Sequence, residues 1–163
     1  MIEIDPVERI GSAPAPPPAE GDYVLQARGA GATMTLLVDR SQLELLSASI
    51  VSMLSGERLT GQDDALRAAD VRDDHVDWRV GRILLGFDED RRLFFLDAEE
   101  LADDEADRPP ASVRLWVEPR QMLALAEQAS ELLAQGLSRC QLCGNARDPA
   151  EHVCPALNGQ SGH

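Results

Sequence analysis

The chain has 163 residues, of which 44% are hydrophobic and 27% charged, as is usual for a single globular domain with a sizeable core. Its 29 acidic and 15 basic residues give a formal net charge of −14, which argues against a nucleic-acid backbone or an anionic membrane as the main partner. No stretch approaches the roughly 20 apolar residues of a membrane span, and the first residues do not resemble a signal peptide, so we expect a cytoplasmic protein with reduced cysteines.

The N-terminal residues predict a short strand and then a connector. Ile2 and Ile4 alternate with acidic residues, and Pro6 interrupts the pattern, which places the strand at an edge of a sheet. Residues 11–21 contain four prolines and indicate a stiff loop of polyproline character.

A β-hairpin and a helix are expected next. Residues 23–27 and 33–38 have the composition of strands, and the glycines at 29 and 31 favour a tight turn between them. Asp39 and Gln42 form a capping-box pair that begins a helix, and Gly56 ends it. The apolar face of this helix comprises Leu43, Leu46, Ile50, Met53 and Leu54.

The middle of the chain is acidic. Residues 59–77 are difficult to assign, apart from a short surface helix predicted at 63–70. Residues 78–87 and 91–97 predict a third and a fourth strand joined by an acidic turn. The seven carboxylates within residues 97–107 indicate a solvated loop, with a contact surface for a basic partner as the alternative.

The last predicted strand and helix repeat the earlier arrangement. Residues 111–117 alternate apolar and polar side chains, as a half-buried strand does. Glu118 and Gln121 then correspond to the capping pair, Pro119 suits the first helical position, and Gly136 ends the helix. The apolar face of this helix comprises Met122, Leu125, Ala129, Leu132 and Leu133.

The two strand–helix stretches align without a gap, which suggests either an internal duplication with a pseudo-twofold or two units that obey the same capping rules. We predict an α+β fold for residues 1–137, with a largely antiparallel sheet and both amphipathic helices on one face. The side chains expected to be buried beneath the helices are Leu46, Met53, Leu125 and Leu132.

The C-terminal residues 138–163 contain all three cysteines of the chain and predict a zinc-binding tail packed on the domain. Cys140 and Cys143 are spaced to form a turn that directs two sulfurs at one point. His152 and Cys154 stand two residues apart, so that in an extended segment both face the same side. These four ligands would fill the tetrahedral shell of a structural Zn²⁺.

Two other interpretations of the cysteines remain. A redox Cys-x2-Cys pair normally begins a helix after a strand, whereas this one follows a helix, and it would leave His152 and Cys154 unexplained. The cysteines could also be incidental free thiols. A disulfide framework would require an oxidising compartment and usually an even number of cysteines.

Four stretches of the chain resemble a bacterial family, Domain of Unknown Function 3090 (DUF3090). They are an early strand at 23–27, a helix start at 38–43, a central strand at 78–88 and the tail from Cys140 to Gly159, which is the most specific. The chain departs from the family in its longer proline-rich loop and in Gln141, where the family usually has proline. The resemblance implies a cytoplasmic bacterial protein and no assigned reaction.

Three functions are compatible with these observations. A zinc-stabilised interaction or adaptor protein with a protein partner fits the filled ligand set and the lack of a known catalytic motif. An enzyme would place its site around Trp78 and Arg79, with His75 and nearby carboxylates. A nucleic-acid binder would use Arg139 and Arg147 beside the metal, against the overall charge.

Overall fold

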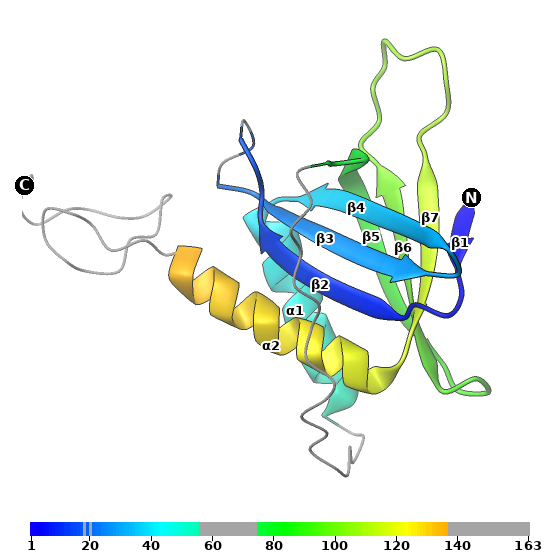
Figure 1. Ribbon diagram of the computed structural model, residues 1–163, viewed down its shortest axis with the longest axis vertical. Coiled ribbons are helices and arrows are strands. Elements are labelled where there is room, and N and C mark those ends of the chain that lie inside the picture. Colours follow the sequence, from blue (N-terminus) through cyan, green and yellow to red (C-terminus); the bar gives the residue numbers. More distant parts are fainter. Residues whose placement is uncertain (18, 20, 56–74, 137–163) are drawn as a thin grey trace, which may run out of the picture.

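The computed structural model describes residues 1–17, 19, 21–55 and 75–136. In this part of the chain a mixed seven-stranded sheet packs against two helices, which confirms the predicted α+β class (Figure 1). The strand order is β1-β7-β6-β5-β4-β3-β2. The elements are β1 (Ile2–Ile4), β2 (Arg9–Pro14), β3 (Tyr23–Gly29), β4 (Ala32–Val38), α1 (Arg40–Leu54), β5 (Trp78–Asp88), β6 (Leu93–Glu100), β7 (Ser112–Val117) and α2 (Pro119–Gly136).

Two β-β-β-α units lie side by side in the sheet. The first unit is β2, β3, β4 and α1, and the second is β5, β6, β7 and α2; strands within each unit are antiparallel. The last strand of the first unit, β4, pairs in parallel with the first strand of the second, β5. Strand order and direction are therefore the same in both units. A twofold axis normal to the sheet would reverse both, so the units are related by displacement along the sheet and not by the pseudo-twofold that one of the two alternatives contained.

The buried faces of α1 and α2 correspond residue by residue. All five pairs stand 79 positions apart, from Leu43 and Met122 to Leu54 and Leu133. The hydroxyl of Ser47 in α1 donates to the Ala126 carbonyl of α2, at 3.2 Å, where the helices meet. The remaining corresponding pairs are Leu46 with Leu125, Ser47 with Ala126 and Ile50 with Ala129.

The burial expected for the two helices is confirmed for two of the four side chains. Leu46 and Leu125 are 4% and 0% exposed. Leu132 is only half-buried, and the burial predicted for Met53 is wrong because this side chain is 37% exposed. Met53 and Leu132 correspond in the two units, and both lie at the margin of the apolar face, where the helix surface turns toward solvent.

A glutamine in the first turn of each helix, Gln42 in α1 and Gln121 in α2, makes the same kind of bonds. The Asp39 carboxylate accepts from the Gln42 N–H, and the Gln42 side-chain oxygen accepts from the Asp39 N–H, so the predicted capping box is formed. In the second helix the Gln121 side-chain oxygen likewise accepts from the Glu118 N–H, at 3.0 Å. The amide nitrogens of Gln42 and Gln121 then donate to a neighbouring backbone, at Val80 in β5 and at Val7 and Glu8 after β1.

Strand β1 pairs with β7 at the end of the sheet remote from β2. The pairing is parallel, as it is between β5 and β4, so β1 stands beside the second unit as β5 stands beside the first. Residues 5–8 then connect β1 to β2 and bridge β7 and β3. The Val7 N–H donates to the Trp116 carbonyl of β7, and the Glu8 N–H donates to the Arg28 carbonyl of β3. A side chain at Gly29 would collide with the Pro6 carbonyl, so this close approach requires glycine.

Several boundaries differ from those predicted, and the differences in β2 and β6 have clear physical reasons. Strand β2 runs from Arg9 to Pro14 and so includes residues 11–14 of the expected proline-rich loop, because Ile10 reaches the core and Pro14, which lacks an N–H, stands at the strand end. Strand β6 begins at Leu93 because the preceding turn continues through Arg92, whose φ is 54°. It continues to Glu100, so the first carboxylates of the acidic run are in a strand rather than a loop. The short helix predicted at 63–70 lies outside the described residues.

One hydrophobic core lies between the sheet and the helices. Both helices and strands of both units contribute to it, and the largest fully buried side chain is Phe94 of β6. Alternation along the strands places Leu96, Leu115 and Val117 in the core and leaves a second set of side chains on the face of the sheet opposite the helices. Within the described residues, neither helix is long and apolar enough to cross a membrane.

Candidate functional site

The four predicted zinc ligands, Cys140, Cys143, His152 and Cys154, lie outside the described residues, as does the whole tail 138–163. Among residues 1–136, apart from the gaps stated above, no three His, Cys, Asp or Glu side chains come together as a metal-binding group. The zinc site therefore stays a prediction from sequence spacing.

The second predicted region is at the junction between β4 and β5, which pair through only two residues of each strand. The paired residues are Leu36 with Trp78 and Leu37 with Arg79. Just before β5, Asp77 binds the backbone of Thr35 twice: its N–H donates to the Thr35 carbonyl at 2.8 Å, and its carboxylate accepts from the Thr35 N–H at 2.7 Å. Asp77 thus extends the pairing of the two units beyond the strand itself.

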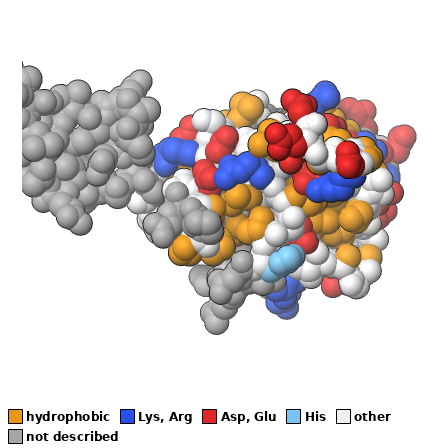
Figure 2. All heavy atoms as spheres, turned by 90° about the horizontal axis from the view of Figure 1, so that it is seen from above, with side chains coloured by type: hydrophobic (Ala, Val, Ile, Leu, Met, Phe, Trp, Pro, Cys, Tyr) orange, Lys and Arg blue, Asp and Glu red, His pale blue; other side chains and the backbone are white. Residues whose placement is uncertain are grey.

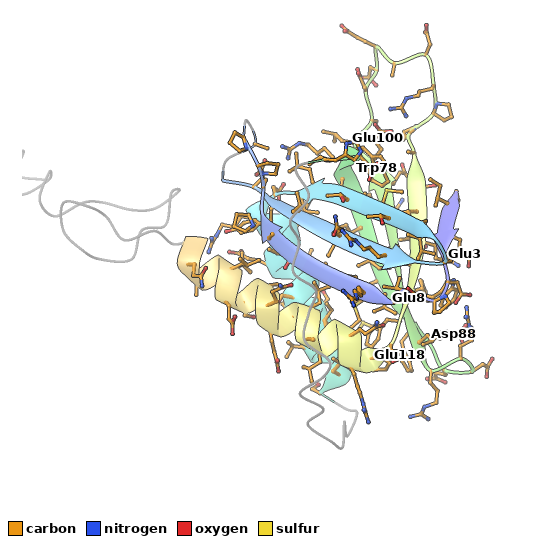
Figure 3. The ribbon with its side chains drawn as sticks, in the orientation of Figure 1. Glu3, Glu8, Trp78, Asp88, Glu100 and Glu118 are labelled. Atoms are coloured by element: carbon orange, nitrogen blue, oxygen red, sulfur yellow. The ribbon has the colours of Figure 1, made fainter. Side chains whose placement is uncertain are left out.

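The other polar side chains at this junction are also engaged. The exposed His75 ring lies 3.1 Å from the Asp77 carboxylate. The Arg79 guanidinium donates to Asp22, which precedes β3, at 2.7 Å. Trp78 is the first residue of β5, and Glu100 of β6 pairs with Val80 two residues further on; Figure 3 labels Trp78 and Glu100 at the same end of the sheet. Of the residues that the sequence suggested for an enzyme site, His75 thus contacts Asp77, whereas Arg79 is paired with Asp22 instead. Asp77 and Arg79 join the two units.

A cluster that the sequence did not predict lies on the helix-free face of the sheet. We call Arg91, Phe95, Arg114 and Trp116 the arginine–aromatic cluster. The Arg91 guanidinium carbon lies 4.1 Å from the centre of the Trp116 ring, and that of Arg114 lies 4.9 Å from the Phe95 ring. The two rings are themselves 5.7 Å apart. Such stacking of cations on aromatic faces is favourable where the groups are shielded from water, and Trp116 is only 8% exposed.

Each arginine of the cluster is also bound to a carboxylate. Arg91 donates to both oxygens of Asp5 at 2.9 Å, and Arg114 donates to both oxygens of Asp97 at 2.6 and 2.7 Å. The hydrogen bond from Arg114 to Asp97 raises the pKa of this arginine above its ordinary value. The bond from the Trp116 ring N–H to Glu3 holds the N-terminal residues on β7, and the pair of Arg91 with Asp5 ties them to the turn between β5 and β6.

Only the sheet register brings this cluster together. Alternation along residues 112–117 indicates that Arg114 and Trp116 share a face, but nothing in the sequence shows that Trp116 stands opposite Phe95 and Arg114 opposite Asp97. The signal that could have found it is a polar and aromatic face on each of two neighbouring strands.

The base of the loop between β6 and β7 is fixed by a further ion pair. Arg108 donates to both oxygens of Glu100, at 2.7 and 2.8 Å, and the Ala111 N–H donates to the same carboxylate at 2.9 Å. The side-chain bond from Arg108, with the backbone bond from Ala111 second, lowers the pKa of Glu100 from its ordinary 4.5 to about 2.

We expect Arg108→Gln to raise the pKa of Glu100 from about 2 toward 4.5, measured by NMR titration of the side-chain carboxyl. Because the pKa is lower in the folded chain than in the unfolded one, ionised Glu100 favours the folded loop above about pH 4.5, and this contribution is lost as the pH falls through 2. As the control, Arg28→Gln on β3 removes an equal charge far from the loop. If the pKa of Glu100 is unchanged in Arg108→Gln, Arg108 is not the cause of its low value.

Acidic and basic side chains are mixed on the surface around this end of the molecule. Figure 2 shows red and blue side chains next to one another, with hydrophobic side chains between them and no large area of blue alone on the face in view. The loop between β6 and β7 projects beyond the sheet in Figure 1, and residues 101–110 are all exposed. This face therefore presents charges of both signs.

Comparison with known sequences gives one match. The family described as protein of unknown function (DUF3090) matches residues 3–154, which is most of the chain. No curated protein and no solved structure is significantly similar to it.

Proposed function

The chain belongs to the DUF3090 family, and we propose that it is a cytoplasmic zinc-binding protein that acts by interaction with another protein. The observation that carries the proposal is the ligand spacing of the tail, Cys140-x2-Cys143 followed by His152-x-Cys154. The family match reaches residue 154 and so spans all four positions, while its description assigns no reaction.

The chemistry of these side chains suits zinc. Three thiolates and one imidazole are the ligands that structural Zn²⁺ sites use, and four protein ligands leave no position for a reacting water. When bound, the metal supplies a covalent-like tie between the two halves of the tail. The imidazole of His152 would donate its free ring N–H to a carbonyl, carboxylate or water, which sets its tautomer. Thiolate ligands also require a reducing compartment, in agreement with a cytoplasmic location.

The use of the polar groups at the β4–β5 junction supports interaction rather than catalysis. Asp77 binds backbone groups of Thr35, and Arg79 is paired with Asp22. In the described residues, every buried side-chain polar atom has a hydrogen-bond partner. Catalytic sites more often keep a poised side chain whose bonds are completed by the substrate.

Metal analysis of the purified full-length chain tests the zinc site. We expect one Zn²⁺ per chain after removal of loosely bound metal, and Co²⁺ substitution should give the intense visible absorption of tetrahedral thiolate ligation. A chain that carries no metal and does not bind Co²⁺ would exclude the site. A metal with an exchangeable water would instead favour the enzyme alternative near Trp78 and Arg79.

A protein partner is tested by isolating the native complex from cells and identifying a component that binds the purified chain directly. The interaction should be measured with the zinc-loaded protein and with the zinc-free Cys143→Ser variant. Loss of binding only in the variant would place the partner at the tail, and equal binding would place it on the α+β domain. If no component rebinds the purified chain, the interaction proposal fails.

Nucleic-acid binding should be negligible at physiological salt because the net charge is −14. The expected result is no shift of duplex DNA or RNA at micromolar protein. Salt-sensitive micromolar binding would contradict this expectation, and Arg139→Ala with Arg147→Ala would then show whether the tail is responsible.

A further inference from the structure

Most of strand β5 has one edge with which no described strand pairs. Its neighbours in the sheet are β6 and β4, but β4 pairs with it only at Trp78 and Arg79. The Val80 carbonyl accepts from the Gln42 side chain. Beyond that point, residues 82–88 pair with β6 on one side, and no described strand pairs with them on the other.

The two outermost strands of the sheet, β2 and β1, differ from β5 in that their edges are covered or very short. The edge of β2 is covered by α2: Gln128 accepts from the Ser12 N–H at 2.7 Å, and Gln121 donates to the carbonyls of Val7 and Glu8 just before the strand. Strand β1 at the other end is only three residues long. Proteins usually protect edges in such ways, because a free edge invites pairing with another chain.

The free edge of β5 carries none of these devices within its apolar stretch. Residues 83–87 are Ile-Leu-Leu-Gly-Phe, without charge or proline. Ile83, Leu85 and Phe87 point toward the core yet are only half-buried, whereas their counterparts in β6, such as Leu96, are fully buried. Leu84, on the opposite face, is 47% exposed. Apolar side chains are thus left partly uncovered along an edge that can accept a strand.

We propose that this edge pairs with the same edge of a second copy of the chain, forming an antiparallel β5–β5 contact centred on Leu85. Antiparallel pairing about this residue places Arg82 opposite Asp88 of the second copy, and Asp88 opposite Arg82. The two charged residues that flank the apolar stretch are therefore complementary to themselves. A twofold contact of this kind closes after two copies and leaves no edge for a third.

The other cross-strand pairs also fit by size. Ile83 meets Phe87 of the second copy on the core side. On the outer side Leu84 meets Gly86, where a side chain would collide with the Phe95 ring that already covers the glycine. The exposed Leu84 would therefore lie against the Phe95 ring of the second copy. Asp88 lies at the far end of β5 from Trp78, away from the junction of the two units (Figure 3). The contact uses no residue of the tail and is independent of the proposed zinc site.

Analytical ultracentrifugation of the full-length chain over a concentration series at physiological salt tests the contact. We expect a concentration-dependent dimer. Arg82→Asp and Asp88→Arg should each weaken it by about tenfold or more, because each places two pairs of like charges across the contact. An equimolar mixture of the two variants should regain dimer, since an edge with two acids then faces an edge with two bases. Glu131→Arg on the exposed side of α2 is the control for a change of charge and should leave the dimer unchanged.

Two further measurements separate dimer loss from loss of folding. Arg82 stands opposite Glu99 in β6, and the Asp88 carboxylate accepts from the N–H groups of Asp90 and Arg91, so thermal unfolding of both variants is recorded. Leu84→Lys should also weaken the dimer, and it changes neither Arg82 nor the hydrogen bonds of the Asp88 carboxylate. A wild-type chain that stays monomeric at all concentrations would overturn the proposal. So would a dimer that both charge variants leave intact, or variants that are folded but do not pair when mixed.

Discussion

Replacing Cys143 by serine is expected to reduce the zinc content of the purified chain from one ion to none. A serine hydroxyl stays protonated near neutral pH and cannot replace a thiolate ligand. Structural zinc sites contribute about 10–16 kcal/mol of binding free energy, and a four-ligand site that loses one thiolate forfeits much of it. Metal analysis by mass spectrometry, with Gln141→Ala inside the same turn as the control, measures the change.

The same variant separates the tail from the domain. Hydrogen exchange should become faster at backbone amides after Arg139, while amides of the sheet keep their protection, because none of the described strands or helices contains a zinc ligand. Unfolding of the sheet together with loss of metal would show that zinc supports the whole domain. Retention of zinc by Cys143→Ser would contradict the ligand assignment.

Leu125→Ala is expected to lower the free energy of unfolding by about 2–5 kcal/mol, the usual cost of truncating a fully buried leucine. Leu125 is 0% exposed and lies on the face of α2 that joins the single core. Urea denaturation followed by circular dichroism measures the loss. If the chain is a dimer, the series is run at a fixed low concentration so that the same state is compared.

Leu45→Ala on α1 is the matched control. It removes the same atoms from a side chain that is 70% exposed, so its effect should stay within about 0.5 kcal/mol. Equal losses for Leu125→Ala and Leu45→Ala would mean that the packing of α2 against the sheet is not as described.

Local rules of sequence explain much of the fold. The capping box of Asp39 and Gln42, the hairpin of β3 and β4 and the apolar faces of both helices follow from spacing over a few residues. Prediction failed where the local structure depends on a contact between residues that are far apart in the sequence. Ile10 belongs to a strand because β3 pairs with it, although prolines follow it closely. Asp97 and Glu100 are held in and beside β6 by Arg114 and Arg108, which only the register brings near.

The candidate sites divide in the same way. The cysteines and histidine of the tail can be recognised because ligand spacing is a local property, yet they lie outside the described residues. His75, Asp77 and Arg79 could be listed from sequence, but their bonds to Thr35 and Asp22 depend on how the two units meet. The free edge of β5 was not foreseen either, because it follows from the length over which β4 pairs with its neighbour.

The position of β1 has a consequence for synthesis of the chain. Ile2 leaves the ribosome long before its partner in β7, Val113. The first unit can form its own hairpins while translation continues, since β2, β3 and β4 are neighbours in sequence. Ile4 and Val7 must remain without their native cover until the second unit has emerged. Completion of the sheet is therefore a late event that joins the two ends of the domain, and such non-local pairing is slow compared with local contacts.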